Sequence, residues 1–562
     1  MASKNNSSQM RDCLTHSETA RESRAGSSRE TVPPKQTFGE TCSAEPPNLR
    51  QKQGTEAWPG NPCDVGKLKR EPDCHMQLDR LCANKKHTVL IDINEFYKGK
   101  IVPHKNLATR GWDKFHVKLP QDYPPNGKES RWEATKRALT KLKNASAGDV
   151  EKAIKTYNQA YSKDWHFDGL HTYVAILPKL ENNFSSVISK MARLAVNLPN
   201  LIQQPIPLLR QNNPHAITMS QEQISCLLAN AFFCTFPHRN THHPRSEYSN
   251  FPTINFSSLF AEGSQRKLQK LRALFHYFST VTDEATKPDG LVTFERICIP
   301  RPEWPEWNRR SENMTNLQVF PNGLIEKEGE GMLQVDFAAK FVGGGVLGRG
   351  LVQEEIRFLQ CPELIVARLF TEKLADNECL KITGVQMYSK TSGYSDDFEW
   401  HSPHKDSTER DEWKRRYCQI VAIDALNFDD PRQQYTEESI KRELLKAYVG
   451  FRKDPDIPIE YTPAIATGNW GCGAFKGDPM LKALIQMMAA AVAQRDLAYF
   501  TFGNKIQAVD LEKMHGLLKR RKISVDKLYN LLKDYCEHRS RHHGPKNVFD
   551  YIREKITGSS QL

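Results

Sequence analysis

Residues 332–356 of the chain read MLQVDFAAKFVGGGVLGRGLVQEEI. The segment begins with an apolar run, residues 332–337, which predicts a buried strand. It continues through a loop with five glycines in residues 343–350 and enters a predicted helix over residues 353–374. Strands that alternate with helices predict a layered α/β fold with a parallel or mixed sheet. Ligands bind such sheets where the strands end, so this loop is the first candidate site.

The glycine-rich loop has the features of an anion-binding loop. Residues without a Cβ let the backbone approach a ligand closely and direct its N–H groups at it. The N-terminus of the following helix adds a partial positive charge. The loop has neither the Gly-Lys-Ser/Thr of a Walker loop nor a GxGxxG fingerprint in its usual form. Many glycine-rich loops are only tight turns, so the loop alone does not identify a phosphate site.

Two carboxylates, Glu354 and Glu355, stand at the start of the predicted helix. Acidic residues are common in a first turn because they interact favourably with the helix dipole, which is the purely structural interpretation. Beside an anion-binding loop, however, extra negative charge would oppose phosphate binding. A carboxylate there therefore indicates another purpose, such as acid catalysis or the binding of ribose hydroxyls. Adjacent helical residues cannot share one face, so we expect the two to have different roles.

A second glycine-rich loop, residues 466–475 (ATGNWGCGAF), follows a predicted strand over residues 465–467. Asp478-Pro479 behind it is a favourable helix cap and first-turn pair, so the order strand, glycine loop, helix recurs. Two such loops in one layer suit a diphosphate bound from two sides, with Phe475 stacking on a sugar. Taken alone, a tight strand-to-helix turn explains this loop equally well.

The rest of the chain predicts an α/β core with additional regions. Residues 1–85 are polar and carry no apolar period, which predicts a disordered tail with regulation as its candidate role. Residues 86–285 form a mostly helical accessory region, residues 286–550 the core, and residues 551–562 a flexible end. The expected strands of the core are residues 291–297, 332–337, 380–387, 418–423, 465–467 and 497–502, with helices over residues 353–374, 436–450 and 479–495.

Composition and net charge narrow the classes of protein to which the chain can belong. The formal net charge of +12 suits a polyanionic partner or a nucleic-acid-associated protein, and charge alone does not choose between them. The 13 cysteines form no CxxC pair and the chain begins without an apolar signal region, so we expect free thiols in a reducing compartment. No apolar run approaches the roughly 20 residues of a membrane span.

Three further groups of residues have a possible function, and each also has a simpler structural interpretation. The basic cluster Lys67-Leu68-Lys69-Arg70 fits a nuclear-import signal, but a solvated tail explains it equally well. Residues 238–243 and the group Cys536, His538, His542 and His543 suggest a metal, yet their spacings fit no standard zinc pattern, so we expect basic loops. Tyr394 and Phe502 lie near loops and are candidates to hold a nucleobase, although single aromatic residues more often serve packing.

These residues resemble the poly(ADP-ribose) glycohydrolase family. Gly343-Gly344-Gly345 followed by Gln353-Glu354-Glu355 is similar to the family signature. The resemblance covers roughly residues 87–550 in order. Further blocks that look like the family are residues 204–209, 218–236, 335–338, 361–364, 420–425, 466–475 and 499–503.

The resemblance implies a macrodomain-like three-layer α/β/α core with a mostly helical N-terminal accessory region. It also implies hydrolysis of the ribose–ribose glycosidic bonds of poly(ADP-ribose), which releases ADP-ribose. By position, Glu355 would be the catalytic acid that protonates the leaving ribose oxygen, and the same carboxylate would then activate water against an oxocarbenium-like sugar. Glu354 and Asp336 would complete the catalytic set by positioning ribose hydroxyls or Glu355.

The resemblance further implies the substrate contacts and partners. Gln353 would belong to the substrate-binding set. The other implied contacts are Gly343, Gly344, Gly345, Gly473 and Ala474 to the diphosphate, Asn469 and Phe475 to the ribose and diphosphate, and Tyr394, Phe502, Ile325 and Glu326 around the adenine. We expect a monomer in the nucleus, the cytoplasm or both. It would act on poly(ADP-ribose) and poly(ADP-ribosyl)ated proteins, with no cofactor, metal, membrane or direct nucleic-acid contact required.

One position departs from the family pattern. Ala339, followed by Lys340, stands where the resemblance leads us to expect Asn near the reacting ribose. Losing a hydrogen bond to a substrate hydroxyl costs about 1 kcal/mol, so we expect activity at a reduced level. The alternatives are a macrodomain-type module that binds ADP-ribose without cleaving it, which Ala339 favours, and a nucleic-acid-binding protein. The latter rests on charge alone and lacks base-stacking motifs.

Overall fold

The computed structural model describes residues 68–105, 111–124, 129–176, 183–241, 243–541 and 546–558. Contacts divide the chain into Met1–Ala57 and Trp58–Leu562, and every described residue belongs to the second unit. Residues 1–67 of the tail predicted for residues 1–85, and the last four residues of the chain, lie outside the described part.

A mixed nine-stranded sheet forms the centre of the described part, in the order β1-β2-β3-β6-β9-β5-β10-β11-β4. Its strands are β1 (His87–Val89), β2 (His215–Ser220), β3 (Leu291–Cys298), β6 (Glu378–Thr383), β9 (Gln419–Asp424), β5 (Leu333–Ala338), β10 (Ile465–Gly468), β11 (Leu497–Phe500) and β4 (Leu317–Phe320). From β9 to β4 all neighbours are parallel, whereas β2, β3, β6 and β9 pair antiparallel. The carboxyl ends of β9, β5, β10 and β11 therefore share one edge of the sheet.

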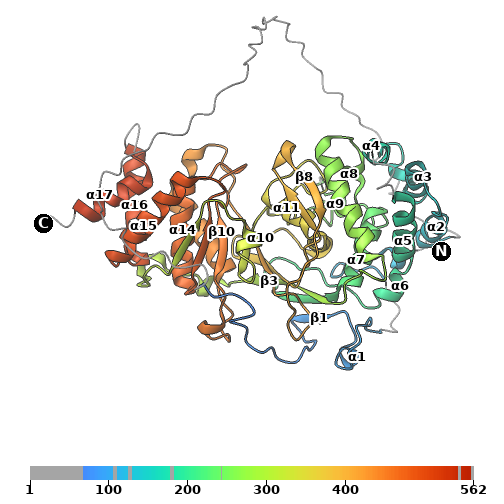
Figure 1. Cartoon of the computed structure of the whole chain (residues 1–562), viewed down its shortest axis with the longest axis horizontal. Coiled ribbons are helices and arrows are strands. Elements are labelled where there is room, and N and C mark those ends of the chain that lie inside the picture. The colour runs from blue at the N-terminus through green and yellow to red at the C-terminus, as the bar shows by residue number, and fades with distance from the viewer. Residues whose placement is uncertain are drawn as a thin grey trace, which may run out of the picture. The chain divides into compact units, whose positions relative to one another are not determined.

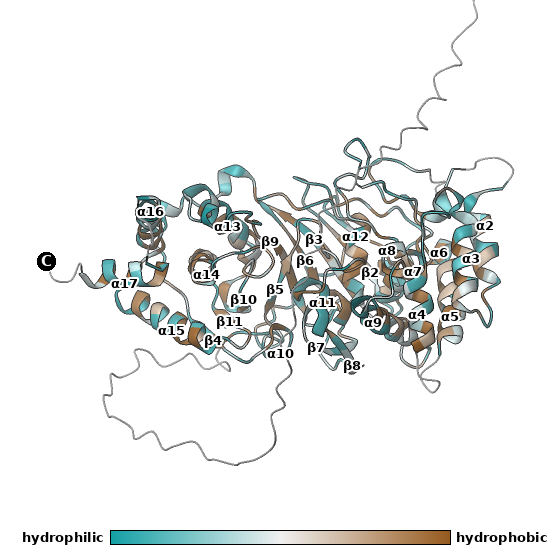
Figure 2. Cartoon of the chain, turned by 90° about the horizontal axis from the view of Figure 1, so that it is seen from above, coloured by the Kyte–Doolittle hydropathy of each residue, from teal (hydrophilic) through white to brown (hydrophobic). Residues whose placement is uncertain are grey.

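Helices cover both faces of the sheet, which gives the predicted three-layer α/β/α core. Alternate residues of β9 enter different cores: Ile420 and Ala422 pack with the accessory helices, while Val421 and Ile423 pack with α13 (Glu437–Phe451) and α14 (Pro479–Ala493). Figure 2 shows β9, β6 and β5 between α14 on one side and α7 and α9 on the other.

The remaining helices gather at the two ends of this unit (Figure 1). Those of the accessory end are α2 (Arg131–Thr140), α3 (Ala147–Tyr157), α4 (Asp168–Ile176), α5 (Phe184–Val196), α7 (Gln221–Phe232) and α9 (Gln265–Val281). Those of the opposite end are α15 (Lys505–Arg520), α16 (Val525–Arg541) and α17 (Val548–Gly558). None of the described helices combines the length and apolarity needed to cross a bilayer.

The predicted core elements are present, with one helix wrong, and strands β2 and β4 of this sheet were missed. The six expected strands of the core correspond to β3, β5, β6, β9, β10 and β11. The helix expected over residues 353–374 is instead α11 (Gln353–Gln360), a 3-10 turn (Pro362–Val366) and the short α12 (Ala367–Phe370). Pro362 lacks an N–H and cannot continue α11, which is the reason for the break. Strand β2 carries no clear alternation, and β4 has only four residues, which is too short for a pattern to stand out. Strands β1 and β2 make the accessory region part of the same sheet.

Both tails are shorter than predicted, because residues at the inner end of each predicted tail pack on the fold. Leu68 is 2% exposed and joins an apolar cluster with Ile325 and Phe500. The carbonyl of Lys69 accepts from Ala464 N at 2.7 Å, and Arg70 Nη1 donates to Glu330 O at 3.2 Å. The described part of the basic cluster is thus docked on the fold. At the other end, residues 551–558 continue α17 and bury Tyr551, Ile552 and Ile556. The boundaries were predicted from long stretches of regularly spaced apolar residues, and neither segment contains such a stretch.

A buried ion pair between Arg296 on β3 and Glu378 on β6 ties the accessory region to the core. Both side chains are fully buried. Arg296 Nη1 also donates to Leu209 O at 2.9 Å, and the Glu378 carboxylate accepts from Asn212 N at 2.6 Å and Ala375 N at 2.8 Å. Removing one partner would leave the other charge buried without compensation.

We predict that Arg296→Met lowers the free energy of unfolding by about 3–5 kcal/mol, because Glu378 would lose its counter-charge in the interior. Lys381→Met is the matched control, since Lys381 pairs at 2.8 Å with Glu295 on the same two strands but both side chains are part-exposed. That change should cost about 0–1 kcal/mol. Urea unfolding followed by fluorescence measures both, and equal losses would contradict the assignment.

Candidate active site

The start of α11 is hydrogen-bonded back to the strand that precedes it. Gln353 Nε2 donates to Val335 O at 3.1 Å, and Gln353 Oε1 accepts from Phe337 N at 2.8 Å. These bonds satisfy the backbone N–H of Phe337 and the backbone C=O of Val335. They also hold the start of α11 beside β5, which sets the distance that the loop over residues 339–352 must span. The loop therefore leaves and returns at the same place on the sheet edge.

The two adjacent carboxylates bind different parts of this loop. Glu354 accepts from Ala339 N at 2.9 Å and Gly343 N at 2.6 Å. Glu355 accepts from Gly345 N at 2.8 Å and Val352 N at 2.9 Å, the last being a helix-capping contact. Both side chains are buried. The two neighbouring Glu residues thus make different contacts, and the different roles expected for them stay a prediction.

The glycines supply space rather than free amides, which corrects the predicted anion-binding role of their N–H groups. Gly343 and Gly345 donate to the two carboxylates, and Gly344 N donates to Phe341 O at 3.0 Å. A Cβ on Gly344, whose φ is +44°, would lie 2.4 Å from Glu355 Oε1 and 2.8 Å from Glu354 Oε2. Only glycine lets the backbone pass between the two carboxylates at this point.

Two buried cations hold the carbonyl side of the same loop. Lys270 of α9 directs its ammonium at the carbonyl oxygens of residues 345–350, and Arg368 of α12 donates to Val342 O and Gly344 O at 3.0 Å each. Neither residue was identified from the sequence. The sequence did contain a signal for Lys270, because a lysine on the apolar face of an amphipathic helix is unusual without a buried partner.

Asp336 completes a cluster of three carboxyl groups. It is 1% exposed, and neither carboxylate oxygen has a hydrogen-bond partner among the described residues. Burial raises its pKa well above the usual range, the nearby Glu355 adds to this rise, and Arg357 opposes it. Burial, Asp336 and Glu355 likewise raise the pKa of Glu354 against its two amide hydrogen bonds. Carboxyl groups this close cannot all ionise easily, so the cluster retains a proton more readily than isolated carboxyls do.

A narrow pocket opens beside this cluster. Its lining includes all four residues expected around an adenine, which come from α10 (Ile325–Glu328), the loop after β7 (Ser389–Ser392) and the end of β11. The Phe502 and Phe337 ring centroids lie 6.4 Å apart in an edge-to-face arrangement. The lining residues are Ile325, Glu326, Gln334, Val335, Asp336, Gln353, Ile356, Arg357, Gln360, Tyr394, Ile420 and Phe502.

The second glycine loop leaves the same sheet edge as the first, because β10 is the parallel neighbour of β5. Its Gly473 and Ala474 are exposed, and Phe475 is half-buried against the core. Asn469 is engaged within the protein: its Oδ1 accepts from Gln507 Nε2 at 2.6 Å and Tyr499 OH at 3.1 Å. We expected both loops to line one pocket. Among the described residues, Gln353 and Phe502 beside the loops line it instead, and the glycines and Glu355 do not.

Comparison with known proteins places this geometry in a family. The helical domain of poly(ADP-ribose) glycohydrolase matches residues 178–296, and its macro domain fold matches residues 304–508. Poly(ADP-ribose) glycohydrolase 1 of Arabidopsis thaliana is 32% identical over 462 residues, which cover 70% of this chain and 82% of the relative. The chain belongs to the poly(ADP-ribose) glycohydrolase family.

Other members are similar over shorter stretches. Poly(ADP-ribose) glycohydrolase 2 of Caenorhabditis elegans is 34% identical over 329 residues, covering 56% of this chain and 66% of the relative. A crystal structure of the glycohydrolase from Deinococcus radiodurans in complex with ADP-ribose has 15% identity and a TM-score of 0.24, over 41% of this chain and 93% of that chain.

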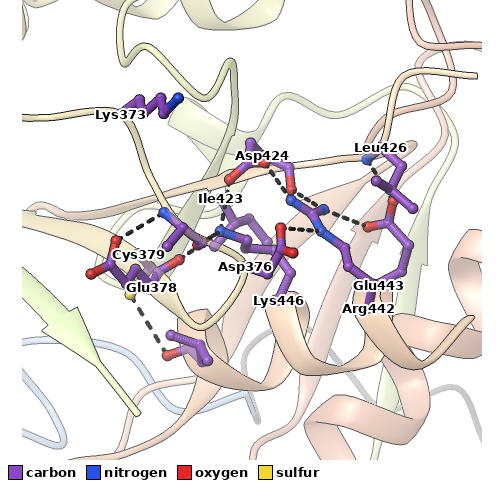
Figure 3. Close-up of polar contacts among 12 residues, drawn as sticks. Lys373, Asp376, Glu378, Cys379, Ile423, Asp424, Leu426, Arg442, Glu443 and Lys446 are labelled. Carbon is purple, nitrogen blue, oxygen red and sulfur yellow. Dashed lines mark hydrogen bonds and ion pairs between the residues drawn. The ribbon is translucent and has the colours of Figure 1, made fainter. Parts of the chain in front are cut away.

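In this glycohydrolase-family chain, a buried charge network supports the second loop (Figure 3). Asp424 at the end of β9 pairs with Lys446 at 2.7 Å and Arg442 at 2.5 Å. Burial raises the pKa of Asp424, but the two cations lower it more, and the result lies below the usual range. The network continues through Glu443 to Lys482, whose ammonium lies 4.2 Å from the ring centroid of Trp470 in the loop.

Asp336 and Asp424 lie on neighbouring parallel strands but should respond oppositely to amide substitution. We predict that Asp336→Asn raises the free energy of unfolding at pH 8 by about 1–3 kcal/mol, since it removes a buried carboxyl without hydrogen bonds. Asp424→Asn should lower it by about 3–5 kcal/mol, since it leaves two cations uncompensated. Urea unfolding at several pH values measures both.

The pH dependence follows from the direction of each pKa shift. Because the native pKa of Asp336 is raised, stability from its neutral form is lost as the pH rises, so the gain in Asp336→Asn shrinks toward acid pH. The native pKa of Asp424 is lowered, so its stabilisation exists above the unfolded value of about 3.9 and disappears below it. Shifts of the same sign in both variants would contradict this description.

Proposed function

We propose that this chain hydrolyses the ribose–ribose glycosidic bonds of poly(ADP-ribose) and releases ADP-ribose. Membership of the family supports the activity, since the relatives bear the name poly(ADP-ribose) glycohydrolase. The observation that carries the proposal for this site is the convergence of Tyr394, Phe502, Glu326 and Asp336 from distant segments on one pocket beside buried carboxyls.

Glu355 acts as the general acid in this proposal. Its two amide contacts fix the carboxyl group, which in its protonated form gives the proton to the leaving ribose oxygen. Cleavage then passes through an oxocarbenium-like sugar, and the resulting Glu355 carboxylate takes the proton of the attacking water. One group thus serves as acid and then base, unlike the usual glycosidase pair of carboxylates.

Glu354 and Asp336 have different positioning roles. Both oxygens of Glu354 accept loop amides, so Glu354 holds in place the loop that donates two further amides to Glu355. Asp336 lines the pocket and has no hydrogen-bond partner among the described residues. Its oxygens are therefore suited to accept hydrogen bonds from ribose hydroxyls, which would also offset the burial of this group.

The substrate contacts in this proposal are those that the family resemblance implies, and the pocket supports the contacts to the adenine. Tyr394 and Phe502 flank the adenine, and Glu326, which accepts from Gln360 Nε2 at 3.2 Å, is placed to accept a hydrogen bond from the adenine amino group. The exposed backbone of Gly473 and Ala474 contacts the diphosphate, and Phe475 lies beside the sugar. Asn469 supports this loop through Gln507 and Tyr499. Gly343, Gly344 and Gly345 contribute close approach of the backbone.

Ala339 brings only a methyl group to the site, and its amide is bound to Glu354. The cost of the missing side-chain hydrogen bond is about 1 kcal/mol, roughly a factor of five in substrate binding or rate, which reduces activity without abolishing it.

In the described residues, no group of three or more His, Cys, Asp or Glu is arranged to hold a metal. Action as a monomer, on modified proteins, in the nucleus or cytoplasm stays a prediction.

Glu355→Gln should abolish release of ADP-ribose from labelled poly(ADP-ribose). Loss of a general acid lowers kcat by about 100- to 10,000-fold, while the amide side chain keeps the shape of the site and hence polymer binding. Chromatography of the products measures release, and filter binding measures affinity. Binding without release by the wild-type chain would contradict the proposal and favour the ADP-ribose-binding module.

Gly344→Ala tests the spacing between the two carboxylates. The new Cβ would overlap Glu355 Oε1, so Glu355 must move, and displacement of a catalytic group by about 1 Å lowers kcat by about 100-fold. Gly348→Ala is the control in the same loop, because its Cβ would meet only Gly345 O, at an ordinary 3.7 Å. Wild-type kcat in Gly344→Ala would show that this spacing does not matter.

A further inference from the structure

A lysine of the accessory region reaches into the loop beside Glu355. Lys270 on α9 is fully buried, and its ammonium donates to Gly345 O and Val346 O at 3.1 Å, to Gly348 O at 3.0 Å and to Gly350 O. A buried ammonium is costly without polar partners, so this set of carbonyl oxygens accounts for its position. The same contacts gather four carbonyl oxygens of the loop around one charge.

The residues that Lys270 binds also contact Glu355. Gly345 accepts from Lys270 through its carbonyl and donates to Glu355 Oε1 through its amide at 2.8 Å. A Cβ on Gly350 would lie 2.6 Å from the same oxygen, and a Cβ on Gly345 would lie 2.7 Å from Gly350 N. Gly345 and Gly350 are thus adjacent, and they lie between the Lys270 ammonium and the Glu355 carboxylate. Without the ammonium, several carbonyl dipoles would point at one another in a buried space.

We infer that Lys270 is a positioning residue for the reaction, which holds the loop over residues 345–350 so that Glu355 stays aligned with the substrate. This inference rests on the proposed function. It assigns the accessory region a direct part in the site, because α9 belongs to that region while Glu355 belongs to the core. Arg368 holds the neighbouring carbonyls of Val342 and Gly344, so Lys270 is responsible for the second half of the loop.

The charge state of Lys270 should then affect turnover. Burial lowers its pKa to about 7, Glu355 acts in the opposite direction, and nearby cations add to the lowering. The charged groups around it are Glu355 on α11, Arg368 on α12, and Lys267 and Arg266 on α9, which pair with Glu262 and Asp396. As the pH rises through about 7, the ammonium loses its proton, its hold on the carbonyls weakens, and kcat falls.

Lys270→Met against Lys267→Met tests the inference in the full chain. Lys267 is also buried on α9, but it donates to Ser258 O at 2.8 Å and makes no recorded contact with the loop. We expect Lys270→Met to lose about 100-fold in kcat with KM changed less than about threefold, and Lys267→Met to keep kcat within about threefold. Hydrogen exchange of the segment 343–352 should accelerate in Lys270→Met alone.

Lys270→Arg provides a second readout, which a merely structural role would not move. A guanidinium stays charged at all accessible pH values, so the fall of kcat above pH 7 should shift upward by about one unit or more. Wild-type kcat and exchange in Lys270→Met, equal losses in both Met variants, or an unshifted pH profile would each overturn the inference. No ADP-ribose release by the wild-type chain would contradict the proposed function, whereas hydrogen exchange would still test the hold of Lys270 on the loop.

Discussion

The site depends on four backbone amides that donate to two buried carboxylates. Glu354 and Glu355 take the amides of Ala339, Gly343, Gly345 and Val352, and thereby determine the course of the whole loop between β5 and α11. Charge-assisted bonds of this kind are stronger than neutral ones, and they offset part of the cost of burying the carboxylates. Lys270 and Arg368 take the opposite, carbonyl side, so anions bind the N–H groups and cations bind the C=O groups of one loop.

The sheet topology brings the other parts of the site to this loop. Because β9, β5, β10 and β11 are parallel neighbours, the Asp424 network, the carboxyl cluster, the second glycine loop and Phe502 all lie at one edge. The accessory region adds strands to the same sheet and sends Lys270 to the core. Lys270 and Arg368 bind carbonyl groups of the first glycine loop. In the described part of the chain, neither oxygen of the buried Asp336 has a hydrogen-bond partner, so Asp336 is suited to bind a ligand.

Local patterns in the sequence predicted six strands of the core and both loops, and they singled out Glu354 and Glu355, because these features depend on neighbouring residues. The pocket residues Tyr394, Phe502, Ile325 and Glu326 could be grouped only through the family resemblance, since they are far apart in the chain. Contacts between distant segments were missed, notably Lys270 and Arg368 on the loop. The internal use of the glycine amides and of Asn469 was also hidden, because a sequence does not show which partner a backbone N–H selects.

The most direct test of the account is a crystal structure of the chain with ADP-ribose bound. We expect the adenine between Tyr394 and Phe502 and the diphosphate against Gly473 and Ala474. A ribose hydroxyl should lie within hydrogen-bond distance of Asp336, with Glu355 facing the ribose and still bound to the amides of Gly345 and Val352. ADP-ribose in a different pocket, or a ribose beyond the reach of both carboxyl groups, would contradict the central claim.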